Sequence, residues 1–130
     1  IYRTGIGCEL NEIEATWKHA TANPVDPVEV SDAPCQEIVW QGADLDVDGQ
    51  GLDGVPVPIS TPGWDNAPYT TLSQYITKDP ETGIQNMGNY RGQVKGQKRL
   101  GMNPSLELRP GIYVHWEKYK KMGKPNPTVM

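Results

Sequence analysis

Apolar residues recur at helical spacing in a stretch near the start of the chain. Ile13 and Trp17 lie on one side of a helix that this spacing predicts over residues 9–22, with acidic residues concentrated at its start, where the helix dipole favours them. A second helix is predicted over residues 113–122, because Gly123 marks its end. The two helices flank a longer section with a different pattern.

This middle section alternates short apolar runs with turn signals. The predicted strands are residues 36–40, 69–78, 84–95, 100–103 and 105–108. Residues 69–78 and 84–95 are predicted to be the arms of a hairpin, because Asp79-Pro80 and Gly83 between them are turn formers. Irregular strands with frequent turns favour a small barrel or sandwich.

The composition predicts a loop-rich chain with a small core. Apolar residues make up 36% of the 130 residues, against about 45–50% on a scale that also counts Gly, and Phe is absent. The chain holds 14 glycines and 12 prolines, and residues 55–59 are too rich in proline for a central strand. We therefore expect apolar surface of this chain to be buried against other segments of a longer protein.

The net charge of −4 argues against an electrostatic partnership with nucleic acid, which needs a basic patch. The one basic cluster is predicted to be a solvated helix face; it comprises Lys118, Lys120, Lys121 and Lys124. No apolar run approaches the roughly 20 residues of a membrane span, and no signal peptide is visible. We expect a soluble, cytoplasmic protein in which Cys8 and Cys35 are free thiols rather than a disulfide.

An acidic loop over residues 44–54 begins like a calcium loop, because Asp44-Leu-Asp46-Val-Asp48-Gly49 matches its first six positions. The twelfth position, which should be a bidentate Glu, is Val55, and the following prolines forbid the helix that such loops need. A solvated acidic loop explains this segment better than a specific calcium site.

Asn86 and Arg91 are the main candidates for chemistry. The guanidinium of Arg91 can bind a phosphate or carboxylate with two hydrogen bonds, and the amide oxygen of Asn86 suits Mg²⁺ or Mn²⁺. An offset of five would place the two side chains on opposite faces of a strand unless a bulge intervenes, and Gly88 is the candidate for such a bulge or for a point of close approach. The alternatives are an Arg paired with a nearby acid and an Asn that serves only a turn or a bulge.

The same region resembles the UbiD family of decarboxylases. Members carry a similar Asn-x-Gly-x-Tyr-Arg-x-Gln segment after a Thr-x-Asp-Pro-x-Thr-Gly hairpin, which here are residues 86–93 and 77–83. The segment Pro27-Val-Glu-Val-Ser-Asp-Ala-Pro-Cys and the elements Arg99-Leu-Gly-Met and Arg109-Pro-Gly are also similar, so the resemblance runs from about Asn23 to Pro127.

This resemblance implies an α+β fold: a partial split β-barrel of the flavin-reductase-like kind over residues 25–130, preceded by a helical linker over residues 1–24. Family members are much longer and carry catalytic glutamates beyond the matching region. Because this sequence opens on Ile1 and closes at Met130, we expect an internal piece of such an enzyme. The implied partners are the remaining segments of the parent enzyme or a second copy of the chain.

By the same resemblance, the parent enzyme would carry out reversible, non-oxidative decarboxylation of an aromatic or α,β-unsaturated carboxylic acid. The implied cofactors are prenylated FMN and Mn²⁺, with K⁺ as a further candidate ion. Arg91 would be the catalytic residue that meets the substrate carboxylate, and Asn86 would contact the metal and the cofactor phosphate. Gly88, Tyr90 and Thr71 would complete the cofactor site.

Two positions depart from the family pattern. Tyr113 falls where the family carries its metal-binding His, so His115 is the candidate ligand, against the alternative of a packing residue. Asn89 stands where the family has an apolar or small residue. The alternatives to a decarboxylase portion are a non-catalytic barrel fragment and a simple FMN-binding or metal-binding β-domain.

Overall fold

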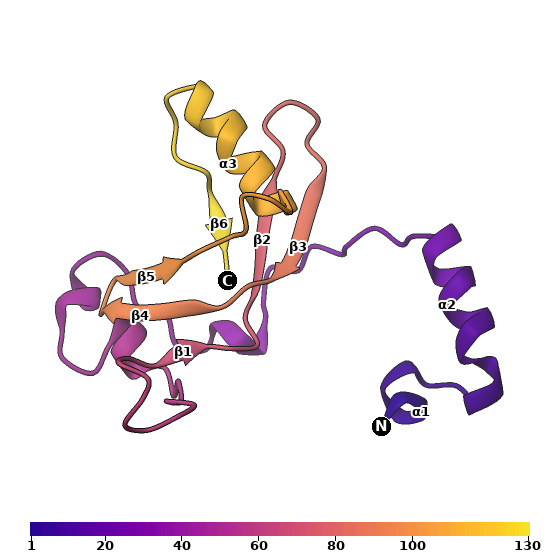
Figure 1. Cartoon of the computed structure of the whole chain (residues 1–130), viewed down its shortest axis with the longest axis horizontal. Helices are drawn as coiled ribbons and strands as arrows, with labels where there is room; N and C mark the ends of the chain where they lie inside the picture. Colours follow the sequence, from indigo (N-terminus) through magenta and orange to yellow (C-terminus); the bar gives the residue numbers. More distant parts are fainter. The chain divides into compact units, whose positions relative to one another are not determined.

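The computed structural model describes all residues, 1–130, and Figure 1 shows them as a ribbon. They divide into two compact units, Ile1–Ile38 and Val39–Met130, each of which is described by itself. The boundary predicted after residue 24 stays a prediction. None of the helices combines the length and the apolar character that crossing a bilayer requires.

The first unit is helical. Helix α1 (Tyr2–Ile6) ends at Gly7, whose φ of 77° suits a glycine, and the sequence had not indicated this helix. The helix predicted over residues 9–22 is confirmed as a short 3₁₀ turn, η1 (Leu10–Glu12), that leads into α2 (Ile13–Ala22). Glu9 begins it through a capping box, since its backbone N–H donates to the Glu12 carboxylate at 3.1 Å.

The strand predicted over residues 36–40 is wrong. The chain forms a 3₁₀ turn, η2 (Pro34–Gln36), and then runs without a strand partner. Ile38 and Val39 remain 70% and 63% exposed, so β-branched residues alone did not make a strand where no neighbouring strand covers them.

The second unit contains two antiparallel sheets of three strands each. The first sheet has the order β1 (Tyr69–Thr70), β4 (Gly92–Gly96), β5 (Arg99–Met102), and the second has the order β3 (Gln85–Asn89), β2 (Gln74–Lys78), β6 (Thr128–Val129). The predicted hairpin is confirmed, but each arm contributes one strand to each sheet. One ribbon therefore links both sheets, as Figure 1 shows for β1 to β4.

The ribbon bends between its two pairs of strands, at residues 71–73 on one arm and 90–91 on the other. Gly92 allows this bend, because a Cβ at this residue would lie 2.5 Å from the Tyr75 hydroxyl and 2.9 Å from Thr70 Oγ1. The Gly92 backbone N–H instead donates to Thr70 Oγ1 at 3.1 Å. A buried hydroxyl pair therefore fixes the chain at the point where it changes sheets.

Of the two roles predicted for Gly88, the bulge is wrong and the close approach is confirmed. Residues Gln85–Asn89 pair with Gln74–Lys78 in unbroken register, and the irregularity lies between Val94 and Gly96. The group that approaches Gly88 is the Tyr90 side chain: a Cβ at this glycine would lie 2.5 Å from the ring carbon Cζ and the hydroxyl of Tyr90. The glycine makes room for an aromatic ring that lies over the strand.

Two further elements complete this unit. The strand predicted over residues 100–103 is confirmed as β5, whereas residues 105–108 form a turn, because the backbone N–H of Leu108 bonds to the Ser105 hydroxyl at 3.3 Å. The acidic stretch after Gln41 contains the 3₁₀ turns η3 (Gly42–Asp46) and η4 (Gly51–Gly54).

The second predicted helix is confirmed as α3 (Gly111–Lys121), which packs against β2 and β3. The buried apolar residues are Tyr75 and Ile112, so the core is small, as the composition predicted. Mixed α+β character is confirmed; the strands of this chain form two separate sheets and not one closed barrel.

Candidate functional site

A cavity of about 850 Å³ lies at the bend of the ribbon. Three of the predicted site residues line it: Thr71, Tyr90 and Arg91. Thr71 directly follows Thr70, and Arg91 directly precedes Gly92. Because Thr70 and Gly92 are paired, the two arms of the hairpin bring Thr71 and Arg91 close together. The wall also includes Pro110, the residue before α3.

The cavity is suited to an anion. Its wall carries two cationic side chains, Arg91 and Lys95, and the hydroxyls of Ser60 and Thr61. Its one carboxylate, Asp65, already accepts the Thr61 backbone N–H at 2.7 Å. A guanidinium, an ammonium and hydroxyl donors are the groups that bind phosphate and carboxylate oxygens.

Arg91 is exposed and forms no ion pair within the chain, so the alternative of an Arg paired with a nearby acid is wrong. Its backbone is held by its neighbours. The Tyr90 ring packs edge-on against Tyr75, with centroids 6.1 Å apart, and Gly92 is anchored to Thr70. The guanidinium is therefore a free donor group on a fixed segment of backbone.

Asn86 does not line this cavity. It lies on β3 opposite Thr77, and its side chain abuts Gly111 at the first residue of α3, where a Cβ would lie 2.9 Å from Asn86 Nδ2 and closer still to Oδ1. Asn86 Nδ2 is buried without a hydrogen-bond partner. Because Pro110 lines the cavity and Gly111 touches Asn86, the two parts of the predicted site meet at the start of α3.

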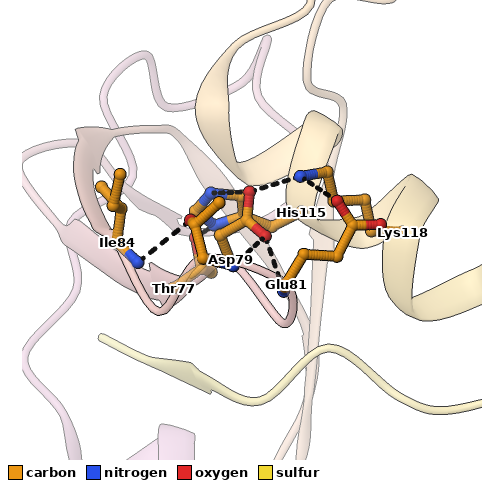
Figure 2. A network of polar contacts seen from close by, with 7 residues as sticks. Thr77, Asp79, Glu81, Ile84, His115 and Lys118 are labelled. Carbon is orange, nitrogen blue, oxygen red and sulfur yellow. Dashed lines mark hydrogen bonds and ion pairs between the residues drawn. The ribbon is translucent and has the colours of Figure 1, made fainter.

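His115 is a buried residue of α3 rather than part of the cavity wall. Its Nδ1 lies 2.8 Å from the Thr77 hydroxyl, and its Nε2 lies 3.9 Å from Asp79 Oδ2 (Figure 2). Tyr113, at the family's His position, donates its hydroxyl to Glu117 at 3.3 Å. No three His, Cys, Asp or Glu residues converge, so the metal role of Asn86 and His115 stays a prediction.

The carboxylate of Asp79 is the centre of a polar cluster at the tip of the β2–β3 hairpin. Asp79 Oδ1 accepts the backbone N–H groups of Glu81 and Thr82, at 2.8 and 3.3 Å. Lys118 of α3 reaches Asp79 Oδ2 at 2.6 Å and Glu81 at 2.8 Å. The Lys118 hydrogen bond, with help from the Glu81 N–H, lowers the pKa of Asp79 to about 2, and the Asp79 and Glu81 carboxylates raise the pKa of Lys118.

Sequence reasoning missed this cluster, although two signals pointed to it. Asp before Pro in a hairpin turn is typical of a side chain that bonds to the backbone two residues on. His115 and Lys118 are three residues apart on one helix and therefore share a face. The local sequence pattern could not show that His115 and Lys118 contact residues 77–81, because these residues are far away along the chain, with Thr77 38 positions before His115.

Two carboxylates of the acidic loop form contacts within the chain. Asp46 pairs with Lys98, and Asp44 accepts the Gln41 backbone N–H at 3.3 Å to begin η3. Cys8 and Cys35 are free thiols, as expected.

Comparisons with known proteins agree with these features. The model of the UbiD family, described as the 3-octaprenyl-4-hydroxybenzoate carboxy-lyase Rift-related domain, matches residues 26–130. A Rhodospirillum rubrum protein, called an uncharacterized protein in the cooM 5′ region, is 34% identical over 113 residues, which cover 87% of this chain and 22% of that protein.

One similar solved structure is the UbiD-class enzyme HmfF from Pelotomaculum thermopropionicum in complex with FMN. It superposes with a TM-score of 0.82 and 24% sequence identity, and the match covers 98% of this chain and 27% of the HmfF chain. The apo 3,4-dihydroxybenzoic acid decarboxylase of Klebsiella pneumoniae gives a TM-score of 0.75 with 30% identity, over 94% of this chain and 25% of that one. This chain thus spans 22% to 27% of the length of these relatives.

Proposed function

This chain belongs to the UbiD family of carboxy-lyases, and from that premise we propose that it forms the cofactor-binding portion of a prenylated-FMN-dependent decarboxylase. The observation that carries the proposal is Arg91, an unpaired guanidinium on a fixed backbone in a cavity with a second cation. The complex of HmfF with FMN, and an evolved dimeric form of the same enzyme with prenylated FMN, support the choice of cofactor.

The residues present fit an anionic cofactor. Arg91, Lys95 and the Thr71 hydroxyl would bind phosphate or carboxylate oxygens, and Tyr90 would pack against an apolar part of the ligand. The buried Nδ2 of Asn86 lacks a partner, and buried polar atoms nearly always have one, so a ligand oxygen near the start of α3 would satisfy it. We propose Asn86 as the contact to cofactor phosphate and to Mn²⁺, with K⁺ as a further candidate ion.

Prenylated FMN, when bound, supplies an electron sink for the bond to the departing carboxylate. The role of Arg91 is to orient the substrate carboxylate and to offset its negative charge. Proton transfer is assigned to carboxylates of the remaining segments of the enzyme. Two of the similar structures are 3,4-dihydroxybenzoic acid decarboxylases, from Klebsiella pneumoniae and Enterobacter cloacae. This similarity supports the proposal that the substrate is an aromatic carboxylic acid.

The small core supports the view that this chain works as part of a larger assembly. Several apolar side chains of this unit are exposed, among them Leu72, Leu106 and Leu108 (83%, 66% and 82% exposed), and Leu108 lines the cavity. We propose that they are covered by the remaining segments of the enzyme, which would also complete the split barrel. A non-catalytic module remains the alternative, and absence of flavin binding would favour it.

FMN binding to Arg91→Gln tests the proposal. A hydrogen bond to a charged group contributes about 1.5–3 kcal/mol, so FMN affinity should fall about tenfold to 150-fold, measured by quenching of flavin fluorescence. The matched control is Arg99→Gln, an exposed arginine of β5 that does not line the cavity. Equal affinities of wild type and Arg91→Gln would refute the assignment of Arg91, and absence of FMN binding in the wild type would refute the function.

A further inference from the structure

Asn86 has no hydrogen bond of its own to hold its side chain. Its Nδ2 is buried without a hydrogen-bond partner, and the side chain lies against Gly111 at the start of α3. An amide that is to bind a ligand must be held in place by its surroundings, because a free rotamer costs binding energy. Residues that fix the separation between β3 and the start of α3 would therefore also hold the Asn86 amide in place.

The β2–β3 hairpin and α3 face each other through a few side chains on each element. Thr77 and Asn86 are partners in the β2–β3 register, and side chains of directly opposed residues project from the same face of a sheet. Gly111, His115 and Lys118 are spaced by four and three residues, so they share one face of α3. Two residues of the hairpin therefore face one stripe of the helix.

The contacts match this arrangement at three successive points. Asn86 abuts Gly111, the Thr77 hydroxyl bonds to His115 at 2.8 Å, and Asp79 pairs with Lys118 at 2.6 Å. Thr77 and His115 are only 2% and 7% exposed, so their hydrogen bond is shielded from water, and its loss would leave buried polar atoms without partners. Figure 2 shows Thr77, Asp79, His115 and Lys118 converging between the hairpin and the helix.

We propose that Thr77, His115, Asp79 and Lys118, here called the His115 network, hold α3 against the hairpin and thereby position the Asn86 amide against Gly111. His115 is then a positioning residue that acts through Thr77. In the tautomer with its hydrogen on Nε2, the imidazole directs that hydrogen toward Asp79 and accepts the Thr77 hydroxyl at Nδ1. The link from Asn86 to ligand affinity rests on the proposed function, whereas the positioning itself does not.

The test uses Thr77→Val, which removes the hydroxyl and keeps the shape, and Thr77→Ser, which keeps the hydroxyl. The first readout is the side-chain amide signal of Asn86 in a proton–nitrogen correlation spectrum, identified by its absence in Asn86→Ala. We expect Thr77→Val to shift this signal and to remove its protection from hydrogen exchange, and Thr77→Ser to restore both. The control is Thr128→Val, which removes an exposed hydroxyl from the β6 residue paired with Thr77.

The second readout is FMN affinity, which we expect to fall about two- to tenfold in Thr77→Val and to recover in Thr77→Ser. If the wild type binds no FMN, the proposed function fails while the Asn86 signal still tests the network. If FMN binds but the Asn86 signal of Thr77→Val matches the wild type, the network proposal is overturned.

Nitrogen chemical shifts of the His115 ring in the wild type keep the proposal testable even if Thr77→Val does not fold. A single tautomer with its hydrogen on Nε2 is expected. A ring that averages between both tautomers would overturn the proposal, because such a ring would not be held by Thr77 and Asp79.

Discussion

Replacement of Gly111 by alanine tests the contact between α3 and Asn86 directly. The new Cβ would lie 2.9 Å from Asn86 Nδ2 and closer to Oδ1 and Cγ, whereas ordinary contact begins at 3.4 Å. The Asn86 amide would have to move by more than 0.5 Å, the difference between 3.4 and 2.9, because Oδ1 and Cγ are more crowded than Nδ2. The outcome depends on whether the amide can move so far.

Two opposing effects set the sign of the change in stability. Alanine is favoured over glycine by up to about 1 kcal/mol in a helix, and Gly111 does not have a positive φ, so the backbone accepts alanine. Overpacking of a fixed neighbour costs about 1–3 kcal/mol. Because the His115 network holds the hairpin against α3, we expect Gly111→Ala to lower the free energy of unfolding by about 1–2 kcal/mol.

The assay is urea unfolding followed by circular dichroism, with the Asn86 side-chain amide signal as a local readout. Gly5→Ala is the control, since this glycine lies in α1 and a Cβ there meets nothing within 4 Å. We expect the control to be neutral or stabilising. An unchanged or raised stability of Gly111→Ala, together with a shifted Asn86 signal, would refute the view that Asn86 is held in place, because the amide would then have moved aside without cost.

Two more changes test the cavity wall and the hairpin tip. Gly88→Ala should displace the Tyr90 ring and destabilise the chain by about 1–3 kcal/mol, measured by the urea midpoint; an unchanged midpoint and unchanged Tyr90 signals would contradict the close contact. The pKa of Asp79 is lowered from 3.8 to about 2, so its contribution to stability is present above pH 3.8 and is lost as the pH falls toward 2. Asp79→Asn should remove this part of the pH dependence in acid unfolding curves, and parallel curves for the two proteins would count against it.

Local signals in the sequence were sufficient where structure is local. The hairpin over residues 69–95 followed from its turn formers, and α3 followed from Gly123, which marks its end. The bend of the ribbon could not be predicted in this way, because both arms read as continuous extended segments. It depends on Thr70, Tyr75 and Gly92, which lie up to 22 residues apart and meet only in the folded chain.

Some residues of the candidate site were predicted to lie together correctly, and others were not. Thr71, Tyr90 and Arg91 do share a cavity, because the two arms of one hairpin bring them together. Asn86 lies on the other side of Pro110, and His115 faces Thr77, a partner 38 residues away that no spacing rule could identify. Residue type indicated what each side chain can bind, whereas tertiary packing decided which neighbours it has.

The continuous ribbon also has a consequence for the order of folding. The β2–β3 hairpin closes over a short turn, and hairpins of this kind form in about 1–10 μs. Once it has formed, the Thr70–Gly92 pair lies just beyond its open end, so β1 and β4 can pair without closing a new long loop. The segment that carries Arg91 and Lys95 would then be shaped before α3 docks, whereas the contact of Asn86 with Gly111 requires α3 to be in place.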